Sequence, residues 1–155
     1  PVLALLEDDR VALELIRDGV HVDDALCAWL DSTLPPGRLI AVTDAMAAAG
    51  AGDGHYLLGS LEVEVDGGVA RVAGTQTVAG STATADRLFR AVAGPEPDDA
   101  DLVRAARQTS VDPARALGRP DRGGLRPGAA ADAVVLDPES LEVRRVLRRG
   151  RWLGA

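Results

Sequence analysis

The sequence predicts an α/β fold with parallel β-strands, and two observations carry this prediction. First, two short apolar runs typical of buried strands, 11–16 and 39–43, flank a helical stretch, so the chain reads strand, helix, strand. Second, the connections between these elements are short, as in a βαβ unit, whose crossover makes the two strands parallel. The stretch Leu3–Asp9 before them resembles the end of a helix.

The helix between the two strands has recognisable ends. Asp23 or Asp24 can cap its first turn, and the sequence "LPPG" ends it at about Leu34. Its expected inward face holds Leu26, Trp29 and Leu30. The first strand has enough apolar residues that we expect burial on both of its faces.

Polar side chains follow both strands at the edge where parallel sheets bind ligands. His21 lies after the first strand, and Thr43 and Asp44 lie after the second. Asp44 is either a turn-forming carboxylate with few solvation partners or a general acid/base or metal ligand, whose pKa a neighbouring cation would set. His21 is either structural or part of the same site, whereas His55, in the turn-like "GDGHYLL", is expected to be an ordinary surface histidine.

The middle of the chain predicts a hairpin followed by a helix. "LEVEV" and "VARV" flank a Gly-rich turn at Asp66-Gly67-Gly68, which is typical of a β-hairpin. "AGST" is expected to open a helix capped by Ser81 or Thr82, whose inward residues are Leu88, Phe89 and Val92. The backbone N–H groups of Thr77–Thr82 would then face a polar or anionic ligand.

The last third of the chain predicts two more helices and a β-rich tail. One helix spans about Ala100–Gln108, and a compact one spans Asp112–Gly118, with Asp112 as the N-cap. Three or four short strands with tight turns follow. Their arginines form a local basic cluster, which a charged edge hairpin explains better than a phosphate or nucleic-acid site: Arg144, Arg145, Arg148, Arg149 and Arg151.

Composition limits the function classes. The 155 residues suit one domain, and 46% hydrophobic residues can form a core. The net charge of 17 − 24 = −7 argues against nucleic acid as a partner. No apolar run reaches the roughly 20 residues that cross a bilayer, and no signal-peptide pattern is present. The lone Cys27 is expected in the core, and a reducing, cytoplasmic compartment is expected for the protein.

The sequence contains no metal-binding motif. It lacks HxH, HExxH and CxxC patterns, and it has only two histidines. The chain begins with Pro1 rather than Met, so we expect either a processed start or the downstream part of a longer protein.

Together these segments resemble the C-terminal part of the N-acetylglucosamine-6-phosphate deacetylase family, within the amidohydrolase superfamily. The resemblance runs over nearly the whole chain. "DGVHV" and "VTDAMAAAG", about twenty residues apart and followed by "AGST", are specific to the deacetylases. "TSVDPARALG" and "GGLRPGAAADAVVLD" are shared across the superfamily. One departure is "GTQTVAGS", where the family usually has Gly-Thr-Leu-Ala-Gly-Ser, so the register near Gln76 is open.

The resemblance implies a fold and a domain division. Residues 1–118 would contain the last two βα units of a (β/α)8 TIM barrel, with an inserted hairpin at about 55–78. Residues 119–155 would be strands of a small β-sandwich. Because a complete barrel takes at least ~200 residues, we expect the chain to be the C-terminal portion of a longer protein. Alone, it is expected to be inactive and unstable, oligomeric or rearranged.

The resemblance also implies site residues. Asp44 would be the catalytic acid/base, taking a proton from metal-bound water and delivering it to the leaving amine of N-acetylglucosamine 6-phosphate. His21 would contact the substrate carbonyl oxygen. The remaining substrate-binding positions would be Asp18, Gly19, Val20, Val78, Ala79 and Gly80. A divalent metal, zinc or similar, would be the cofactor, with ligands outside this chain, and the complete enzyme would be a homodimer.

Two other interpretations remain open at this stage. The chain could come from another amidohydrolase that acts on a cyclic amide, since the tail blocks are shared. It could also be a non-catalytic scaffold domain derived from a barrel.

Overall fold

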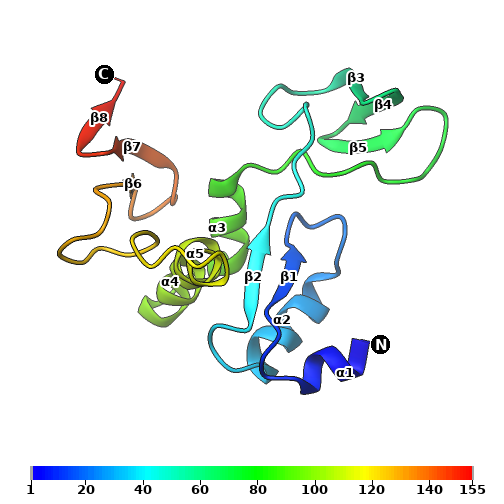
Figure 1. Cartoon of the computed structure of the whole chain (residues 1–155). Helices are drawn as coiled ribbons and strands as arrows, with labels where there is room; N and C mark the ends of the chain where they lie inside the picture. The colour runs from blue at the N-terminus through cyan, green and yellow to red at the C-terminus, as the bar shows by residue number, and fades with distance from the viewer. Residues whose placement is uncertain (1, 155) are drawn as a thin grey trace.

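The computed structural model describes residues 2–154, and a parallel pair of strands lies at its centre. After helix α1 (Val2–Glu7), β1 (Leu13–Ile16) leads through a loop into α2 (Asp24–Thr33) and back into β2 (Leu39–Val42). The strands pair in parallel, with Leu13 opposite Leu39. The predicted βαβ unit is therefore confirmed, and its strands end at the same edge of the sheet (Figure 1).

Burial in this unit is less symmetrical than expected. Leu39, Ile40 and Ala41 of β2 are buried, but no residue of β1 is, because the helical segments 85–93 and 107–116 pack against β2 and not against β1. Asp23 caps α2 as predicted. Cys27 and Leu30 are the buried residues of α2, whereas Leu26 and Trp29, one position earlier and so rotated by about 100°, remain half-exposed. Cys27 is in the core, as expected.

A small antiparallel sheet lies beyond the carboxyl end of β2 (Figure 1). It consists of β3 (Gly54–Leu58), β4 (Leu61–Asp66) and β5 (Val69–Val72). The predicted hairpin is confirmed as β4 and β5, and β3 adds a third strand that places the exposed His55 in a strand rather than a turn. Its core holds Met46, Ala48, Val63, Val65, Ala70 and Ala79, so two connecting segments contribute to it.

The helices that follow the small sheet lie beside β2, on the side away from β1 (Figure 1). They are α3 (Ala85–Ala93), α4 (Asp99–Ala106), the π-helix η1 (Arg107–Val111) and α5 (Asp112–Ala116). Their core contains Ala41, Ala83, Leu88, Val92, Ala93, Ala105 and Leu141, with Phe89 packed against it.

Two predicted helix starts are wrong. Helix α3 begins after Thr84, not after Ser81 or Thr82, because Ser81 is held in an extended bridge to Ala45. Asp112 is not an N-cap: the π-helix makes the helical backbone continuous, and the buried Asp112 carboxylate instead pairs with Arg107 at 3.2 Å.

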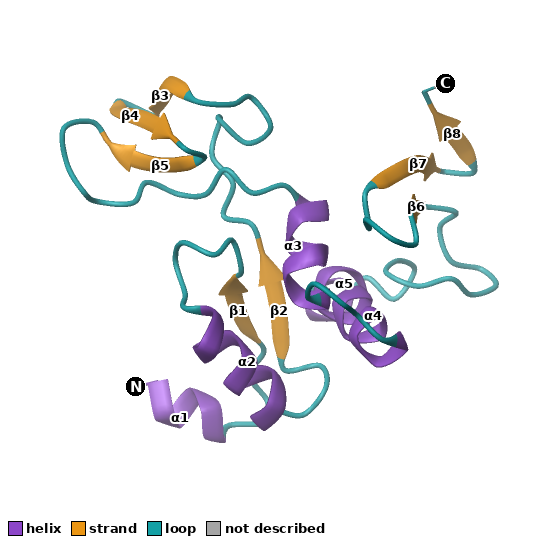
Figure 2. Ribbon diagram, turned by 180° about the vertical axis from the view of Figure 1, so that it is seen from behind, coloured by secondary structure: helices purple, strands orange, loops and turns teal. Residues whose placement is uncertain are grey.

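The tail forms a three-stranded antiparallel sheet, as predicted. It consists of β6 (Ala133–Leu136), β7 (Val143–Arg148) and β8 (Arg151–Leu153), and it lies across the helices from the β1–β2 pair (Figure 2). Two arginines of the basic cluster have partners there: Arg144 pairs with Asp137 at 2.8 Å, and Arg145 stacks on the ring of Trp152. Among the helices of residues 2–154, none is long and apolar enough to cross a membrane.

Candidate active site

Asp44 lies two residues after the end of β2 and adopts an unusual backbone conformation. Its φ is +49°, in the left-handed region that L-residues other than Asn and Asp rarely occupy. The side chain is exposed, so the expectation of few solvation partners is wrong: the strand ends at an open edge and water can reach the carboxylate. Strained backbone at the end of a parallel strand is typical of functional positions.

Asp18 and His21 form a compact pair after β1. The Asp18 carboxylate accepts hydrogen bonds from the backbone N–H groups of Val20 and His21, both at 3.0 Å, and lies 2.8 Å from His21 Nδ1. The left-handed Gly19 (φ +77°) permits this turn. Since an ionised carboxylate only accepts, Nδ1 carries the proton and Nε2 is left for another partner.

The environment of Asp18 keeps its carboxylate ionised. The side chain is only 5% exposed, and this burial by itself would raise its pKa. Hydrogen bonding from the backbone of His21 and Val20, from the Ser81 hydroxyl and from the His21 ring outweighs burial, so the pKa of Asp18 is lower than its ordinary value. The pair is therefore a fixed anion beside an oriented imidazole.

Val78 and Ala79 lie in extended backbone and Gly80 in a left-handed bend, and none of them lies at a helix start. Val78 bridges to Arg71, and Ala79 donates its N–H to the carbonyl of Ala70 at 3.0 Å. The prediction that a helix N-terminus presents free N–H groups here is wrong, since this stretch continues the edge of the small sheet. Gly80 has a φ of +74°, and a Cβ there would lie 3.2 Å from the Asp44 carbonyl oxygen.

Ser81 connects the 78–81 segment to the Asp44 segment through its main chain. The sequence predicted only a helix-capping role for this residue. Its N–H donates to the Asp44 carbonyl and its carbonyl accepts from Met46 N–H, both at 2.9 Å. The residue is 2% exposed. Ala79, Ser81 and Ala83 are buried with a period of two, as in a strand, but this alternation is visible only in the structure, because the residues from 79 to 83 are all small.

The structure thus brings two of the site segments together. The Asp44 segment and the 78–81 segment share main-chain hydrogen bonds, whereas the Asp18–His21 pair makes its hydrogen bonds within the loop after β1. They do not share one cavity. Asp18 and Gly19 line a cavity of about 610 Å³, Thr43 lines another of about 360 Å³, and Asp44 lines neither.

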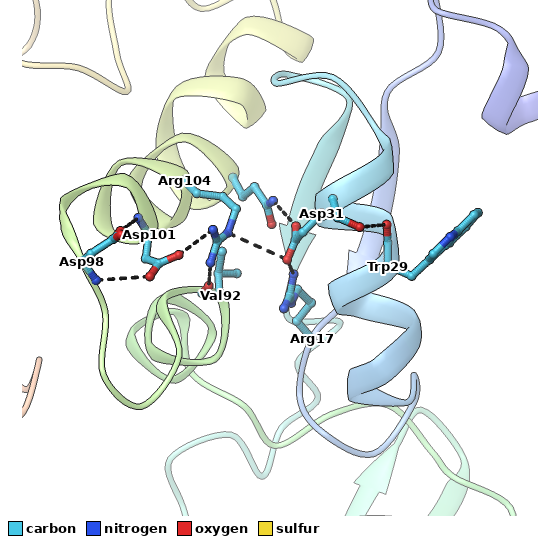
Figure 3. A network of polar contacts seen from close by, with 9 residues as sticks. Arg17, Trp29, Asp31, Val92, Asp98, Asp101 and Arg104 are labelled. Carbon is cyan, nitrogen blue, oxygen red and sulfur yellow. Dashed lines mark hydrogen bonds and ion pairs between the residues drawn. The ribbon is translucent and has the colours of Figure 1, made fainter.

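A polar network supports the β1 end of the site (Figure 3). Asp31 of α2 contacts Arg17, the residue before Asp18. It also accepts from Gln108 at 2.6 Å and lies 3.9 Å from Arg104, so it ties the loop after β1 to α4 and η1.

The described side chains do not fit a divalent metal. Within residues 2–154, no three His, Cys, Asp or Glu side chains gather as ligands, whereas zinc in proteins takes three or four.

Known proteins are similar to this chain in both sequence and structure. No protein-family model matches the chain. It is 40% identical over 150 residues to N-acetylglucosamine-6-phosphate deacetylase of Bos taurus, covering 92% of this chain and 36% of the relative. A shorter Escherichia coli K12 protein, provisionally named N-acetylgalactosamine-6-phosphate deacetylase, is 39% identical over 147 residues, covering 94% of this chain and 85% of the relative.

A solved structure is similar in both sequence and fold. It is an aspartate-to-alanine variant of N-acetyl-D-glucosamine-6-phosphate deacetylase from Mycobacterium smegmatis, in complex with N-acetyl-D-glucosamine-6-phosphate. Sequence identity is 51% and the TM-score is 0.92, covering 98% of this chain and 40% of that one. The chain therefore spans roughly two fifths of the length of most of these relatives. Because the chain has a mixed α/β structure and is similar to these relatives in sequence and fold, it belongs to the N-acetylglucosamine-6-phosphate deacetylase family.

Proposed function

We propose that this chain is the C-terminal portion of a deacetylase that hydrolyses N-acetylglucosamine 6-phosphate to glucosamine 6-phosphate and acetate. The observation that carries the proposal is that Asp44 and the Asp18–His21 pair follow neighbouring parallel strands at the same edge of the sheet. Family membership supplies the reaction class, and the Mycobacterium smegmatis neighbour was solved with this sugar phosphate.

Asp44 is the proposed acid/base. Its exposed carboxylate can take a proton from the water that attacks the acetamide carbonyl and then return it to the leaving nitrogen. Amide hydrolysis needs that second transfer, because an unprotonated amine is a poor leaving group. The left-handed backbone turns the chain at Asp44 sharply out of the strand.

His21 is the proposed partner of the carbonyl oxygen. Its Nδ1–H is held by Asp18 at 2.8 Å, so the ring is oriented and Nε2 is the nitrogen left for the substrate. In the doubly protonated ring, Nε2 donates to the oxygen on which negative charge develops. The backbone of Gly19, Val20 and Val78–Gly80 is proposed to line the sugar.

The proposed fold of the complete enzyme is a (β/α)8 barrel in which β1 and β2 are the last two strands. Residues 1–118 would belong to the barrel, with an insertion at about 55–78, and residues 119–155 would belong to a small β-sandwich. Parallel pairing with one crossover helix supports this assignment. A homodimer in the cytoplasm is the proposed state. The divalent metal implied by the family does not fit the described residues, so no step assigned here runs through it.

Acetate release by the full reading frame tests this proposal. We expect N-acetylglucosamine 6-phosphate to be hydrolysed, and Asp44→Asn to lower kcat by about 10²–10⁴-fold. Asp66→Asn, at an exposed position on β4, is the matched control and should retain activity. Activity without any loss in Asp44→Asn would remove the acid/base role.

A second sugar is favoured by one relative. The Escherichia coli K12 protein, of which the chain covers 85%, is named for the galactosamine isomer. Comparing kcat/KM for the two N-acetylhexosamine 6-phosphates decides between them. No hydrolysis of either would leave another amidohydrolase or a scaffold domain as the function.

A further inference from the structure

Gln108 connects the π-helix η1 to the polar network beside the candidate site. Its Nε2 donates to Asp31 Oδ1 at 2.6 Å, although the two residues are 77 positions apart in the sequence. Gln108 is the buried residue of η1, with 6% of its surface exposed. A π-helix holds an extra residue in its turn, which changes the direction of its side chains, and such turns are frequent at functional sites. This turn therefore places one amide group inside the protein, directed at α2.

Packing alone does not account for an amide at position 108. Because an ionised carboxylate only accepts hydrogen bonds, the amide directs its nitrogen to Asp31 and its oxygen away from it. Within residues 2–154, the Oε1 atom of Gln108 is buried and has no hydrogen-bond partner. An unpaired buried acceptor costs free energy, and a methionine of similar size would fill the space without that cost. What the amide adds over such a side chain is its hydrogen bond to Asp31.

From Asp31 the contacts continue to the loop that carries the histidine (Figure 3). Asp31 Oδ2 lies 2.5 Å from Arg17 Nη1. One peptide bond joins Arg17 to Asp18, whose carboxylate accepts from the backbone N–H of His21 at 3.0 Å and lies 2.8 Å from its Nδ1. The two carboxylates are nearly buried, with side-chain exposures of 12% for Asp31 and 5% for Asp18. A displacement of Asp31 would therefore move the residue next to the one that orients His21.

We propose that Gln108 is a positioning residue of the active site, because its hydrogen bond to Asp31 helps to orient His21. The connection between them runs through the ion pair that Arg17 makes with Asp31. This inference rests on the proposed function, in which His21 donates to the oxygen that gains negative charge. Since that interaction strengthens in the transition state, loss of the amide lowers kcat and leaves KM nearly unchanged.

Gln108→Met in the full-length enzyme tests this proposal. The variant keeps the volume of the side chain and removes the donor to Asp31. We expect kcat for N-acetylglucosamine 6-phosphate to fall roughly 10- to 100-fold, as when a catalytic group is slightly displaced, and KM to change less than about threefold. Gln76→Met is the matched control, because Gln76 is exposed in the turn after β5, and it should retain the kcat of the parent enzyme.

The Nδ1–H proton of His21 gives a readout that needs no substrate. Its NMR signal in the full-length enzyme is assigned by its loss in His21→Gln, and its exchange with water is slow while Asp18 holds it. We expect faster exchange in Gln108→Met than in Gln76→Met or the parent. Faster exchange without hydrolysis by any of these proteins would support the positioning role and remove the proposed sugar. Unchanged exchange together with unchanged kcat would overturn the inference.

Gln108→Glu keeps the proposal testable should Gln108→Met fail to fold. While the introduced carboxyl group is protonated, its O–H can donate to Asp31 as the amide does, and once it ionises two negative charges face each other. Burial and the Asp31 carboxylate raise its pKa, whereas Arg17 and Arg104 lower it. Further charged groups lie on η1 itself and on the helices around it: Arg107, Asp24 of α2, Asp86, Arg87 and Arg90 of α3, Asp99 and Asp101 of α4, and Asp112 and Arg115 of α5.

The pH dependence of this variant then separates positioning from packing. We expect its kcat, divided by that of the parent at the same pH, to fall as pH rises, because ionisation removes the donor to Asp31. Gln76→Glu introduces the same group at the surface, so its ratio should stay constant. A constant ratio in Gln108→Glu, or an equal fall in both variants, would contradict a specific role for the Gln108 hydrogen bond.

Discussion

Arg17 and Asp31 form a nearly buried ion pair, with 2.5 Å between Arg17 Nη1 and Asp31 Oδ2 and side-chain exposures of 9% and 12%. Arg17 directly precedes Asp18, and Asp31 lies on α2. The pair therefore anchors the loop of the candidate site to the crossover helix. A pair this deeply buried is expensive to break from one side, because the remaining charge keeps its desolvation cost.

Replacing Asp31 with Ala should be strongly destabilising. The variant leaves the Arg17 guanidinium and the Gln108 amide without their acceptor. We expect a loss of about 3 kcal/mol or more in the free energy of unfolding, measured by urea denaturation. Asp121→Ala is the control, since Asp121 and Arg119 pair at the surface with about half of each side chain exposed. Equal losses in the two variants would contradict the structural role of Asp31.

Much of the fold follows from local patterns. The parallel pair was predictable because apolar runs, a capped helix and short connections agree on one arrangement. The β4–β5 hairpin was predictable because Gly67 and Gly68 supply the left-handed turn that it needs. These are cases in which neighbouring residues alone determine the conformation.

The predictions that were wrong concern residues whose conformation depends on contacts with residues distant in sequence. A small polar residue after Gly80 resembles a helix cap, but Ser81 pairs with the Asp44 segment, 37 positions away, and so stays extended. Asp112 resembles an N-cap before Pro113, but its carboxylate is buried against Arg107 and the helix runs through it. The left-handed φ of Asp44 is one that Asp tolerates, but residue preference alone does not indicate which of the many Asp residues adopts it.

Gly80→Ala should disturb Asp44 directly. The backbone at Gly80 is left-handed, and an added Cβ would lie 3.2 Å from the Asp44 carbonyl oxygen and 3.4 Å from Met46 Cβ. Gly74 is the matched control, because its φ of +72° is nearly the same and no atom lies within 4 Å of its added Cβ. We expect a loss of about 1 kcal/mol for Gly74→Ala and about 2 kcal/mol or more for Gly80→Ala.

Measuring activity and urea denaturation for Gly80→Ala and Gly74→Ala separates the effect of a strained backbone conformation from the effect of a close atomic contact. Only Gly80→Ala should also lower kcat, because only that Cβ presses on the segment that carries the acid/base. If both variants lose the same free energy of unfolding and keep full activity, the close approach of Gly80 to Asp44 does not matter for activity.

Asp18 should contribute a pH-dependent part of the stability. Its pKa is lowered in the folded protein, so its contribution is fully present above the unfolded value of about 4 and is lost as pH falls through the folded pKa. Asp18→Asn cannot lose a charge, so the stability difference between the wild type and this variant should shrink below about pH 4. Urea midpoints at pH 7 and pH 3 measure it, and a difference independent of pH would show that Asp18 acts by packing alone.

Asp53 should hold the β4–β5 turn close to the candidate site. Its two carboxylate oxygens accept from the N–H groups of Gly67 and Gly68, both at 2.9 Å, and the Thr82 hydroxyl donates to the Gly68 carbonyl. Asp53→Ala removes both acceptors, so we expect local opening to become easier by about 1 kcal/mol and amide exchange at the two glycines to become roughly fivefold faster.

The matched control for the turn is Asp66→Ala, an exposed carboxylate at the start of the same turn. It should leave exchange at Gly67 and Gly68 unchanged, because neither N–H is bonded to it. Exchange that increases equally in the two variants would mean that charge near the turn matters, rather than the Asp53 hydrogen bonds. Faster exchange in Asp53→Ala alone would show that the Asp53 hydrogen bonds help to fix the β4–β5 turn to the loop after Asp44.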